Sequence, residues 1–208
     1  MVVERKFISD ALIKFKISNY LEKELSKAGF SRVEIQKTPM ITRITVYVTN
    51  PGRVIGSGGQ TINALTEDIK ERFHIQNPQI SVAEVKNTKL EPRIVARYIA
   101  NSLERGANPR SLLHSILRDI IAEGALGAEI IVSGKLAAKG AKARTIKVMH
   151  GYIPKAGAVR DLVDEVRLTA YPKYGAIGVT VRIVQPGTKF PDMEIKEVEL
   201  PKVIAEAR

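Results

Sequence analysis

Hydrophobic positions in the first 90 residues follow a helical pattern, then two alternating patterns, then a helical one again. Apolar side chains recur at steps of three and four up to Ala28, and Gly29 follows them, which predicts a helix that ends at this glycine. Two alternating runs separated by a short turn then predict a β-hairpin. The predicted order is helix, strand, strand, glycine turn, helix and strand, over residues 17–28, 33–35, 44–48, 50–59, 60–74 and 80–85.

The second half of the chain begins with two helical patterns and continues with strands. A helix is predicted over residues 93–105, and a second one starts at Pro109 and continues to Gly124. The period then changes to two in four short runs, at residues 130–132, 146–148, 166–170 and 177–183. Two helices followed by a mostly antiparallel four-stranded sheet form an α+β layer.

Polar residues and a proline interrupt both patterns near residues 87–92, which predicts a boundary there. We therefore expect an α+β protein of two domains and a C-terminal segment. The N-terminal domain covers residues 1–87, the second domain covers 88–191, and the acidic segment covers 192–208. Five carboxylates against three cations in that last segment favour a tail or a protein contact over a contact with RNA.

The composition narrows the class of protein. The 208 residues include no cysteine, which excludes a disulfide framework, a thiolate zinc site and a cysteine nucleophile. No stretch approaches the roughly 18 apolar residues of a membrane span, and the first residues lack the apolar core of a secretory signal. Thirty-three Lys and Arg against 22 Asp and Glu give a net charge of +11. Such a surplus is typical of a protein that binds polyanions, most often nucleic acid.

The cations are concentrated where acids are absent. No Asp or Glu occurs between Glu129 and Asp161, and we expect the seven cations of this stretch to remain unpaired, so that their potentials add. Five of them are the candidate contacts to RNA: Lys135, Lys139, Lys142, Arg144 and Lys147. If about six cations each neutralise one phosphate, the logarithm of the affinity should fall with the logarithm of salt at a slope of roughly −4 to −5.

A glycine loop precedes the helix predicted at residue 60. Gly56 and Gly59 bracket two residues, so the backbone there can adopt angles and approach a ligand in ways that a Cβ would prevent. The N–H groups that open the next helix then face a phosphate. A dinucleotide fingerprint would need a glycine at Thr61, and a P-loop would need a lysine after Gly59. The candidate RNA-binding residues of this loop are Arg53, Gly56, Ser57, Gly58, Gly59 and Gln60.

Three strings of residues resemble a known family. Residues 54–62, VIGSGGQTI, are similar to the loop of a type II KH domain, which implies the order α-β-β-α-α-β. Residues 127–135, GAEIIVSGK, and 174–183, YGAIGVTVRI, resemble the C-terminal domain of the small-subunit ribosomal protein S-three family. The length of the chain and the continuation after Lys135 resemble the archaeal branch.

This resemblance implies a structural constituent of the head of the small ribosomal subunit, in the cytoplasm. It implies that the protein binds ribosomal RNA, helps to form the entrance of the messenger RNA channel and contacts neighbouring head proteins. Arg110 and Arg118 carry over from the family's cationic cluster at that entrance, whereas a third cation does not. The KH loop departs from the common pattern by having Ser57 and Gly58 where Lys or Arg is usual.

Nothing in the sequence argues for catalysis. The three histidines are isolated from one another and from carboxylates at ligand spacing, and no nucleophile motif is present, so we expect neither an enzyme nor a metal or other cofactor. The alternative to the ribosomal function is a stand-alone KH regulator that binds short single-stranded RNA. That alternative predicts a preference for a base sequence and an exposed apolar groove beside Ile55 and Ile62.

Overall fold

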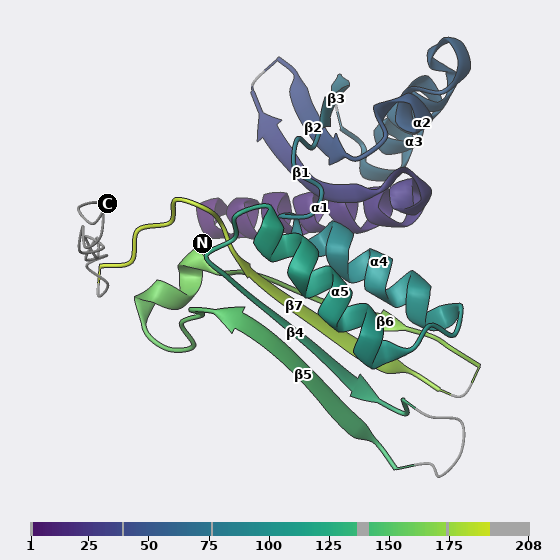
Figure 1. The fold of residues 1–208 in the computed structure, drawn as a ribbon. Coiled ribbons are helices and arrows are strands. Elements are labelled where there is room, and N and C mark those ends of the chain that lie inside the picture. Colours follow the sequence, from purple (N-terminus) through teal and green to yellow (C-terminus); the bar gives the residue numbers. More distant parts are fainter. Residues whose placement is uncertain (1, 39, 76, 137–141, 174, 192–208) are drawn as a thin grey trace, which may run out of the picture.

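The computed structural model describes residues 2–38, 40–75, 77–136, 142–173 and 175–191. These residues form two β-sheets, one from each half of the chain, and each sheet packs against its own helices (Figure 1). The mixed α+β class predicted from the sequence is confirmed.

The N-terminal half has the element order α-β-β-α-α-β that the KH resemblance implies. Its central strand β2 pairs antiparallel with β1 and parallel with β3. The elements are α1 (Val2–Glu24), β1 (Phe30–Lys37), β2 (Thr42–Val48), α2 (Pro51–Ile55), α3 (Gln60–Phe73) and β3 (Pro78–Glu84), with short 3-10 turns at Leu25–Ala28 and Ser57–Gly59.

The core of this half lies between the helices and one face of the sheet. Ile44, Val46 and Val48 alternate inward along β2 and are fully buried, as the sequence pattern predicts. Ile17 and Leu21 of α1 pack against them in the same cluster. Each side chain of this size contributes roughly 1.5–3 kcal/mol when it leaves water. This burial fixes the helices to the sheet.

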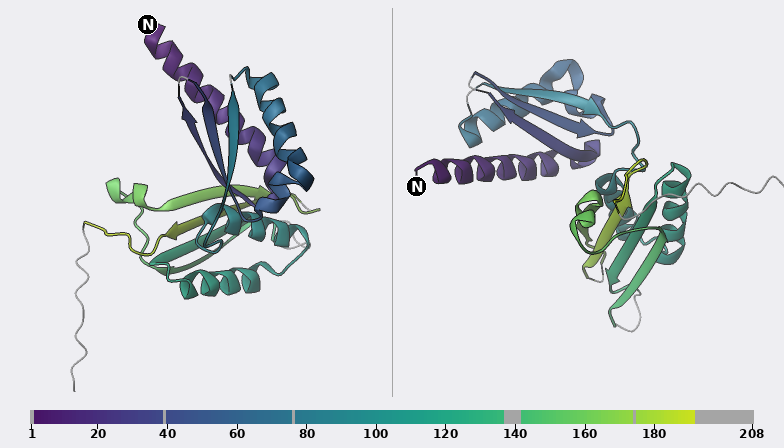
Figure 2. Two further views of the ribbon diagram at one scale, coloured as in Figure 1. Left: turned by 90° about the horizontal axis from the view of Figure 1, so that it is seen from above. Right: turned by 90° about the vertical axis from the view of Figure 1, so that its left-hand side faces the viewer.

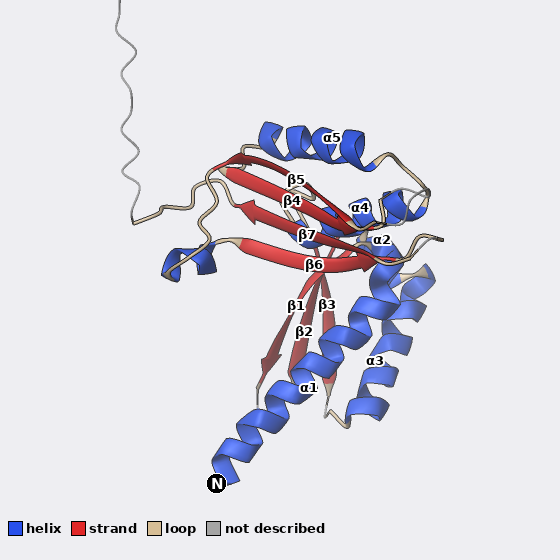
Figure 3. Ribbon diagram, turned by 90° about the horizontal axis from the view of Figure 1, so that it is seen from below, coloured by secondary structure: helices blue, strands red, loops and turns tan. Residues whose placement is uncertain are grey.

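Helix α1 starts much earlier than the predicted residue 17. Its first half projects along and past the sheet (Figure 3). The inward spacing that identified the helix begins only near Ile13 and Ile17, since residues further upstream have apolar side chains that point to solvent. The α-helix ends at Glu24, and the 3-10 turn Leu25–Ala28 continues the helical segment to Gly29. This segment ends as predicted, because Gly29 adopts a left-handed conformation with φ of 76°.

The C-terminal half consists of two helices and a four-stranded sheet in which every strand pair is antiparallel. The strand order β5-β4-β7-β6 places β4 and β7 in the centre. The elements are α4 (Pro92–Glu104), α5 (Pro109–Ala122), β4 (Gly127–Gly134), β5 (Arg144–Gly151), the 3-10 helix η3 (Ala158–Leu162), β6 (Asp164–Ala170) and β7 (Ile177–Val184).

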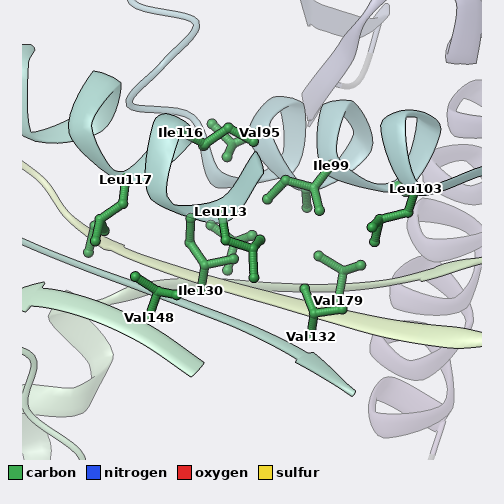
Figure 4. Packing of buried hydrophobic residues seen from close by; sticks show 14 of the residues in the cluster. Val95, Ile99, Leu103, Leu113, Ile116, Leu117, Ile130, Val132, Val148 and Val179 are labelled. Carbon is green, nitrogen blue, oxygen red and sulfur yellow. The ribbon is translucent and has the colours of Figure 1, made fainter. Parts of the chain in front are cut away.

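Both helices pack on the same face of this sheet. Leu113 of α5 and Ile99 of α4 point down onto Ile130, Val132 and Val179, all of which are at most 1% exposed (Figure 4). The strand residues between these inward positions point to the opposite face. No described helix covers that opposite face, which we call the open face (Figure 1).

The two halves meet where α4 approaches α1 and β1 (Figure 2). Arg93 of α4 donates a hydrogen bond to Glu22 of α1, and its guanidinium lies 5.3 Å from the centre of the Phe30 ring. Arg97, one turn further along α4, lies 3.7 Å from the same carboxylate. Charged side chains thus connect the two halves, in contrast to the apolar packing within each core.

Candidate nucleic-acid interface

The glycine loop between α2 and α3 has the backbone geometry that the sequence predicts. Gly56, Gly58 and Gly59 have φ of 72°, 61° and 80°, a region that residues with a Cβ rarely adopt. A Cβ on Gly56 would lie 2.1 Å from Oγ1 of Thr61, so a glycine is needed at that position for two reasons. Around Gly58 there is open space within 4 Å, which leaves room for a ligand to approach.

The loop presents polar groups to solvent at the start of a helix. Arg53, Ser57, Gly58 and Gln60 are exposed. The N-cap residue Gly59 has no side-chain acceptor for the first N–H groups of α3. Such N–H groups, together with the helix dipole, favour an anion such as a phosphate. Arg53 is the one cation among the six candidate residues of this loop.

Two apolar side chains lie beside the loop, at the place where the alternative KH function predicts an apolar groove. The side chain of Ile55 is 42% exposed, and Ile62 on the first turn of α3 is partly buried. An apolar side chain at this position can contact the face of an unstacked base.

The candidate cations of the C-terminal half lie at the end of the β4–β5 hairpin. Lys135, Lys142 and Arg144 are exposed, and within the part of the chain that the structure describes they form no ion pair. Arg144 stands opposite Gly134 in the strand register, at the start of β5. Lys139 lies outside the described residues. The three described cations therefore direct an uncompensated positive charge to solvent.

The fifth candidate, Lys147, has a carboxylate partner. Its Nζ lies 2.7 Å from Oε1 of Glu129, which is fully buried on the adjacent strand β4. Lys155 and Arg160 are also paired, with Glu129 and Glu165 at 3.7 Å each. The expectation that all seven cations remain unpaired is thus wrong for these three. Strand pairing places Lys147 opposite Ile131, and hence beside the acid that precedes the acid-free stretch.

Sequence reasoning missed the charge cluster around Glu129. Burial disfavours the charged carboxylate, but the ammonium group of Lys147 at 2.7 Å and the hydrogen bond from Arg182 outweigh it and keep the pKa of Glu129 below its ordinary value. A hydrogen bond from Arg182 likewise lowers the pKa of Glu165. The only signal in the sequence is the acid at residue 129 within an otherwise apolar strand.

The two messenger-contact candidates lie on the solvent side of α5. Arg110 and Arg118 are both exposed, and eight residues correspond to about 12 Å along a helix, on roughly the same face. Asn108 caps this helix, because its Oδ1 accepts a hydrogen bond from the backbone N–H of Arg110 at 3.1 Å. The cap fixes the start of the helix and thus the position of Arg110.

The described residues contain no group of three or more His, Asp and Glu side chains close enough to hold a metal ion. Among the same residues, none of the helices is both long and apolar enough to cross a membrane.

The glycine loop on a three-stranded KH-type sheet, followed by a cation-rich α+β unit, defines a two-part protein of the RNA-binding class. The family model of the KH domain matches residues 16–90, and the model of the ribosomal protein S3 C-terminal domain matches residues 99–183. The pairing of these two matches in one chain points to a single family.

Relatives in three archaea are each called small ribosomal subunit protein uS3. The chain is 44% identical to that of Methanothrix thermoacetophila, over 100% of this chain and 76% of the relative. It is 41% identical to that of Methanocaldococcus jannaschii, over 99% of both chains. It is 42% identical to that of Methanococcoides burtonii over 92% of this chain, but spans only 63% of that relative. The chain belongs to the uS3 family of small-subunit ribosomal proteins, which is not a family of enzymes.

Proposed function

We propose that this protein is a structural constituent of the head of the small ribosomal subunit in the cytoplasm, where it binds ribosomal RNA. The observation that carries the proposal is the joint occurrence of the KH unit and the S3 C-terminal unit in a chain with exposed, unpaired cations at Lys135, Lys142 and Arg144. The cations provide the affinity for phosphate, and the glycine loop provides a backbone site for one phosphate.

Within this proposal, residues 1–87 and 88–191 act as two RNA-binding domains, and residues 192–208 contact protein. Arg53 and Gln60 flank the phosphate site of the first domain. In the second domain the five candidates of the hairpin, Lys139 and Lys147 included, contact ribosomal RNA. Lys147 keeps 39% of its side chain exposed despite its pairing with Glu129, so it can still meet a phosphate.

The entrance of the messenger channel is the second part of the proposal. The exposed face of α5 presents Arg110 and Arg118 about 12 Å apart, which corresponds to two or more phosphates of an extended strand. No carboxylate of the described residues forms an ion pair with either arginine. This face can therefore attract a passing RNA strand without holding a particular base sequence.

Contacts to neighbouring head proteins are supported by the outward face of α1. Phe7, Ile8, Leu12 and Phe15 are between 52% and 72% exposed. Apolar clusters of this kind on a soluble protein commonly mark an interface with another protein. Exposed Arg5 and Lys16 lie on the same part of the helix, which suits a partner whose apolar surface is bordered by carboxylates.

Sedimentation tests the ribosomal function against the stand-alone regulator. The tagged protein is expressed in an archaeal host, and the lysate is run through sucrose gradients at moderate and high salt. We expect the protein to migrate with small subunits at moderate salt and to be released at high salt. A protein found only in the free pool, with a marked preference for one short RNA sequence, would instead establish the regulator, for which the exposed Ile55 is the supporting feature.

A further inference from the structure

The open face of the second sheet contains a charge cluster in addition to the hairpin cations. Along each strand, the residues that alternate with the core positions point to this face. Glu129 of β4 and Arg182 of β7 are two such residues, and they stand side by side in the strand register. Glu165 of β6 lies next to Arg182 in the register. The open face therefore has a row of alternating charges across three adjacent strands.

Glu129 binds cations from three different segments. Its Oε2 accepts a hydrogen bond from Arg182 at 2.7 Å. Its Oε1 lies 2.7 Å from Nζ of Lys147 and 3.7 Å from Nζ of Lys155, but the ammonium groups are outside hydrogen-bond geometry. A carboxylate that is completely buried holds its partners in place much more firmly than an exposed one, because losing them would leave an unpaired buried charge.

Glu165 binds a second set of cations. Arg167 lies 2.6 Å from its Oε1, and Arg160 of η3 lies 3.7 Å from its Oε2. Arg182 also reaches Oε2 at 3.1 Å, so it connects the two carboxylates. All of these atoms belong to one network.

The network has more positive than negative charges. Two carboxylates hold five cations, so a surplus of three positive charges remains on this part of the sheet. The four cations other than Arg182 keep between 39% and 67% of their side chains exposed. Their remaining N–H groups therefore point to solvent while the carboxylates fix their positions.

A cavity of about 580 Å³ opens between Lys155, Arg160 and Arg182. Asp161 and Glu165 also line it, so cations outnumber acids there by one. A small apolar cluster that includes Ile153, Val184 and Phe190 anchors the segment before β6 to the end of β7. The wall of the cavity is consequently packed in place.

The part of the open face next to the charge cluster has small side chains, several of which carry hydroxyl groups. Five small residues occupy the outward positions toward the hairpin end of the sheet: Ser133, Thr145, Thr169, Gly178 and Thr180. A Cβ on Gly178 would lie 3.3 Å from Oγ of Ser133, so the glycine keeps the surface flat at this point. Small side chains allow an RNA backbone to approach closely, and hydroxyl groups can bond its phosphates and 2′-hydroxyls.

We propose that the open face of the β5-β4-β7-β6 sheet is a second RNA backbone-binding surface, formed by Lys147, Lys155, Arg160, Arg167 and Arg182, in which Glu129 is a positioning residue. The proposal rests on the ribosomal RNA binding proposed above and extends it from the hairpin to the whole face. A phosphate in the cavity receives hydrogen bonds from Arg160 and Lys155, while Glu129 and Glu165 hold Arg182 beneath them.

The first experiment removes two exposed arginines of the face. Arg160→Gln with Arg167→Gln leaves both carboxylate partners of Arg182 in place, so we expect the variant to fold. The matched control is Arg32→Gln with Arg72→Gln, two exposed arginines of the N-terminal half with the same change in charge. Binding of the full chain to purified small-subunit ribosomal RNA is measured by filter retention across a range of KCl concentrations.

We expect the Arg160/Arg167 variant to lose affinity roughly 10-fold or more at 0.1 M salt, and its salt slope to decrease in magnitude by about 1.5. The control should change affinity less than about 2-fold. If the Lys142→Glu, Arg144→Glu hairpin variant loses binding while the Arg160/Arg167 variant does not, the open-face proposal is overturned and the proposed function stands. If the wild-type chain does not bind this RNA, the proposed function itself fails.

The second experiment separates positioning from net charge. Glu129→Gln raises the net charge by one, so simple electrostatics predicts tighter RNA binding. The positioning role predicts the opposite, a loss of roughly 3- to 10-fold, because Lys147 and Lys155 lose their carboxylate partner and Arg182 is held by Glu165 alone. Near-native circular dichroism confirms that the variant is folded, and tighter binding by the folded variant would overturn the positioning role.

Unchanged RNA binding of the Arg160/Arg167 variant together with lost sedimentation with subunits would assign the face to a protein partner instead.

Discussion

The two halves of the molecule offer phosphate two different kinds of site. The glycine loop of the N-terminal half relies on backbone N–H groups and open space, with Arg53 as the nearby cation. The C-terminal half relies on side-chain charge, part of it unpaired at the hairpin and part of it arranged around Glu129 and Glu165. A backbone site depends on shape and a cationic surface depends on salt, so the two contributions can be measured separately.

Substitutions in the two cores should have the largest effect, and they test whether the two halves unfold separately. Ile44 and Ile130 occupy equivalent central strand positions and are fully buried. Truncation of either to alanine should cost about 2–5 kcal/mol of unfolding free energy. Because charged side chains connect the two halves, we expect each substitution to lower hydrogen-exchange protection mainly in its own half. Equal loss of protection across both halves would mean that the chain unfolds as one unit, against the proposed division at residues 87–88.

Charge reversal at the hairpin should have the next largest effect. Lys142→Glu with Arg144→Glu removes two unpaired cations and adds two negative charges, so we expect affinity for ribosomal RNA to fall roughly 100-fold at 0.1 M salt. The same reversal at Lys196 and Lys202, in the acidic C-terminal segment, serves as the control. Filter binding measures both, and equal losses would show that the hairpin is not the cationic surface.

The stability of the two halves should depend on pH in opposite directions, with a loss at low pH in the C-terminal half and a loss at high pH in the N-terminal half. The pKa values of Glu129 and Glu165 are lowered in the folded protein, so the stability that they contribute is present above the ordinary carboxylate pKa and is lost as pH falls through the lowered value. In the N-terminal half, burial and the hydrogen bond to Asp68 raise the pKa of Tyr20 to about 12. That contribution is present below pH 10 and is lost as pH rises toward 12.

Urea unfolding at a series of pH values measures both effects. Glu129→Gln should remove much of the acid-dependent loss of stability, and Tyr20→Phe should remove the alkaline loss, at a cost of about 1–2 kcal/mol at neutral pH. An alkaline loss that persists in Tyr20→Phe would show that another group is responsible.

The smallest expected effects concern the glycine loop. Ser57→Asp places a carboxylate at the N-terminal end of α3, where the helix dipole favours it, so stability should be unchanged or slightly increased. RNA affinity should nevertheless fall roughly 3- to 5-fold if a phosphate binds there. Ser57→Asn, with a similar size and no charge, is the control. If Ser57→Asp binds RNA as tightly as Ser57→Asn, this loop does not contact phosphate.

Much of the fold could be predicted from local patterns. Alternation along β2 and β7 identified the buried positions, and Gly29 and His74 marked the ends of two helices, each with a positive φ. Glycine geometry in the loop was equally local, since Gly56 must avoid Thr61 only five residues away. Such features are set by residues a few positions away in the chain, so a local sequence pattern is enough to predict them.

The charge cluster could not be predicted in the same way. Glu129 alternates with apolar residues, which is the sequence pattern of an ordinary solvent-facing strand residue. It becomes buried because Lys155, 26 positions later, and Arg182, 53 positions later, are placed over it by strand pairing and by the segment before β6. Counting acids along the chain overestimated the unpaired charge for the same reason, because pairing partners are set by sheet register.

The strand order of the two sheets has a consequence for synthesis of the chain. The N-terminal sheet is complete once β3 has been made, at Glu84. The second sheet lacks one of its two central strands until β7 is finished at Val184, because β7 separates β4 from β6. During translation, the first half can therefore fold while the second still exposes its helices, so the nascent chain passes through a long interval in which chaperone protection of α4 and α5 matters most.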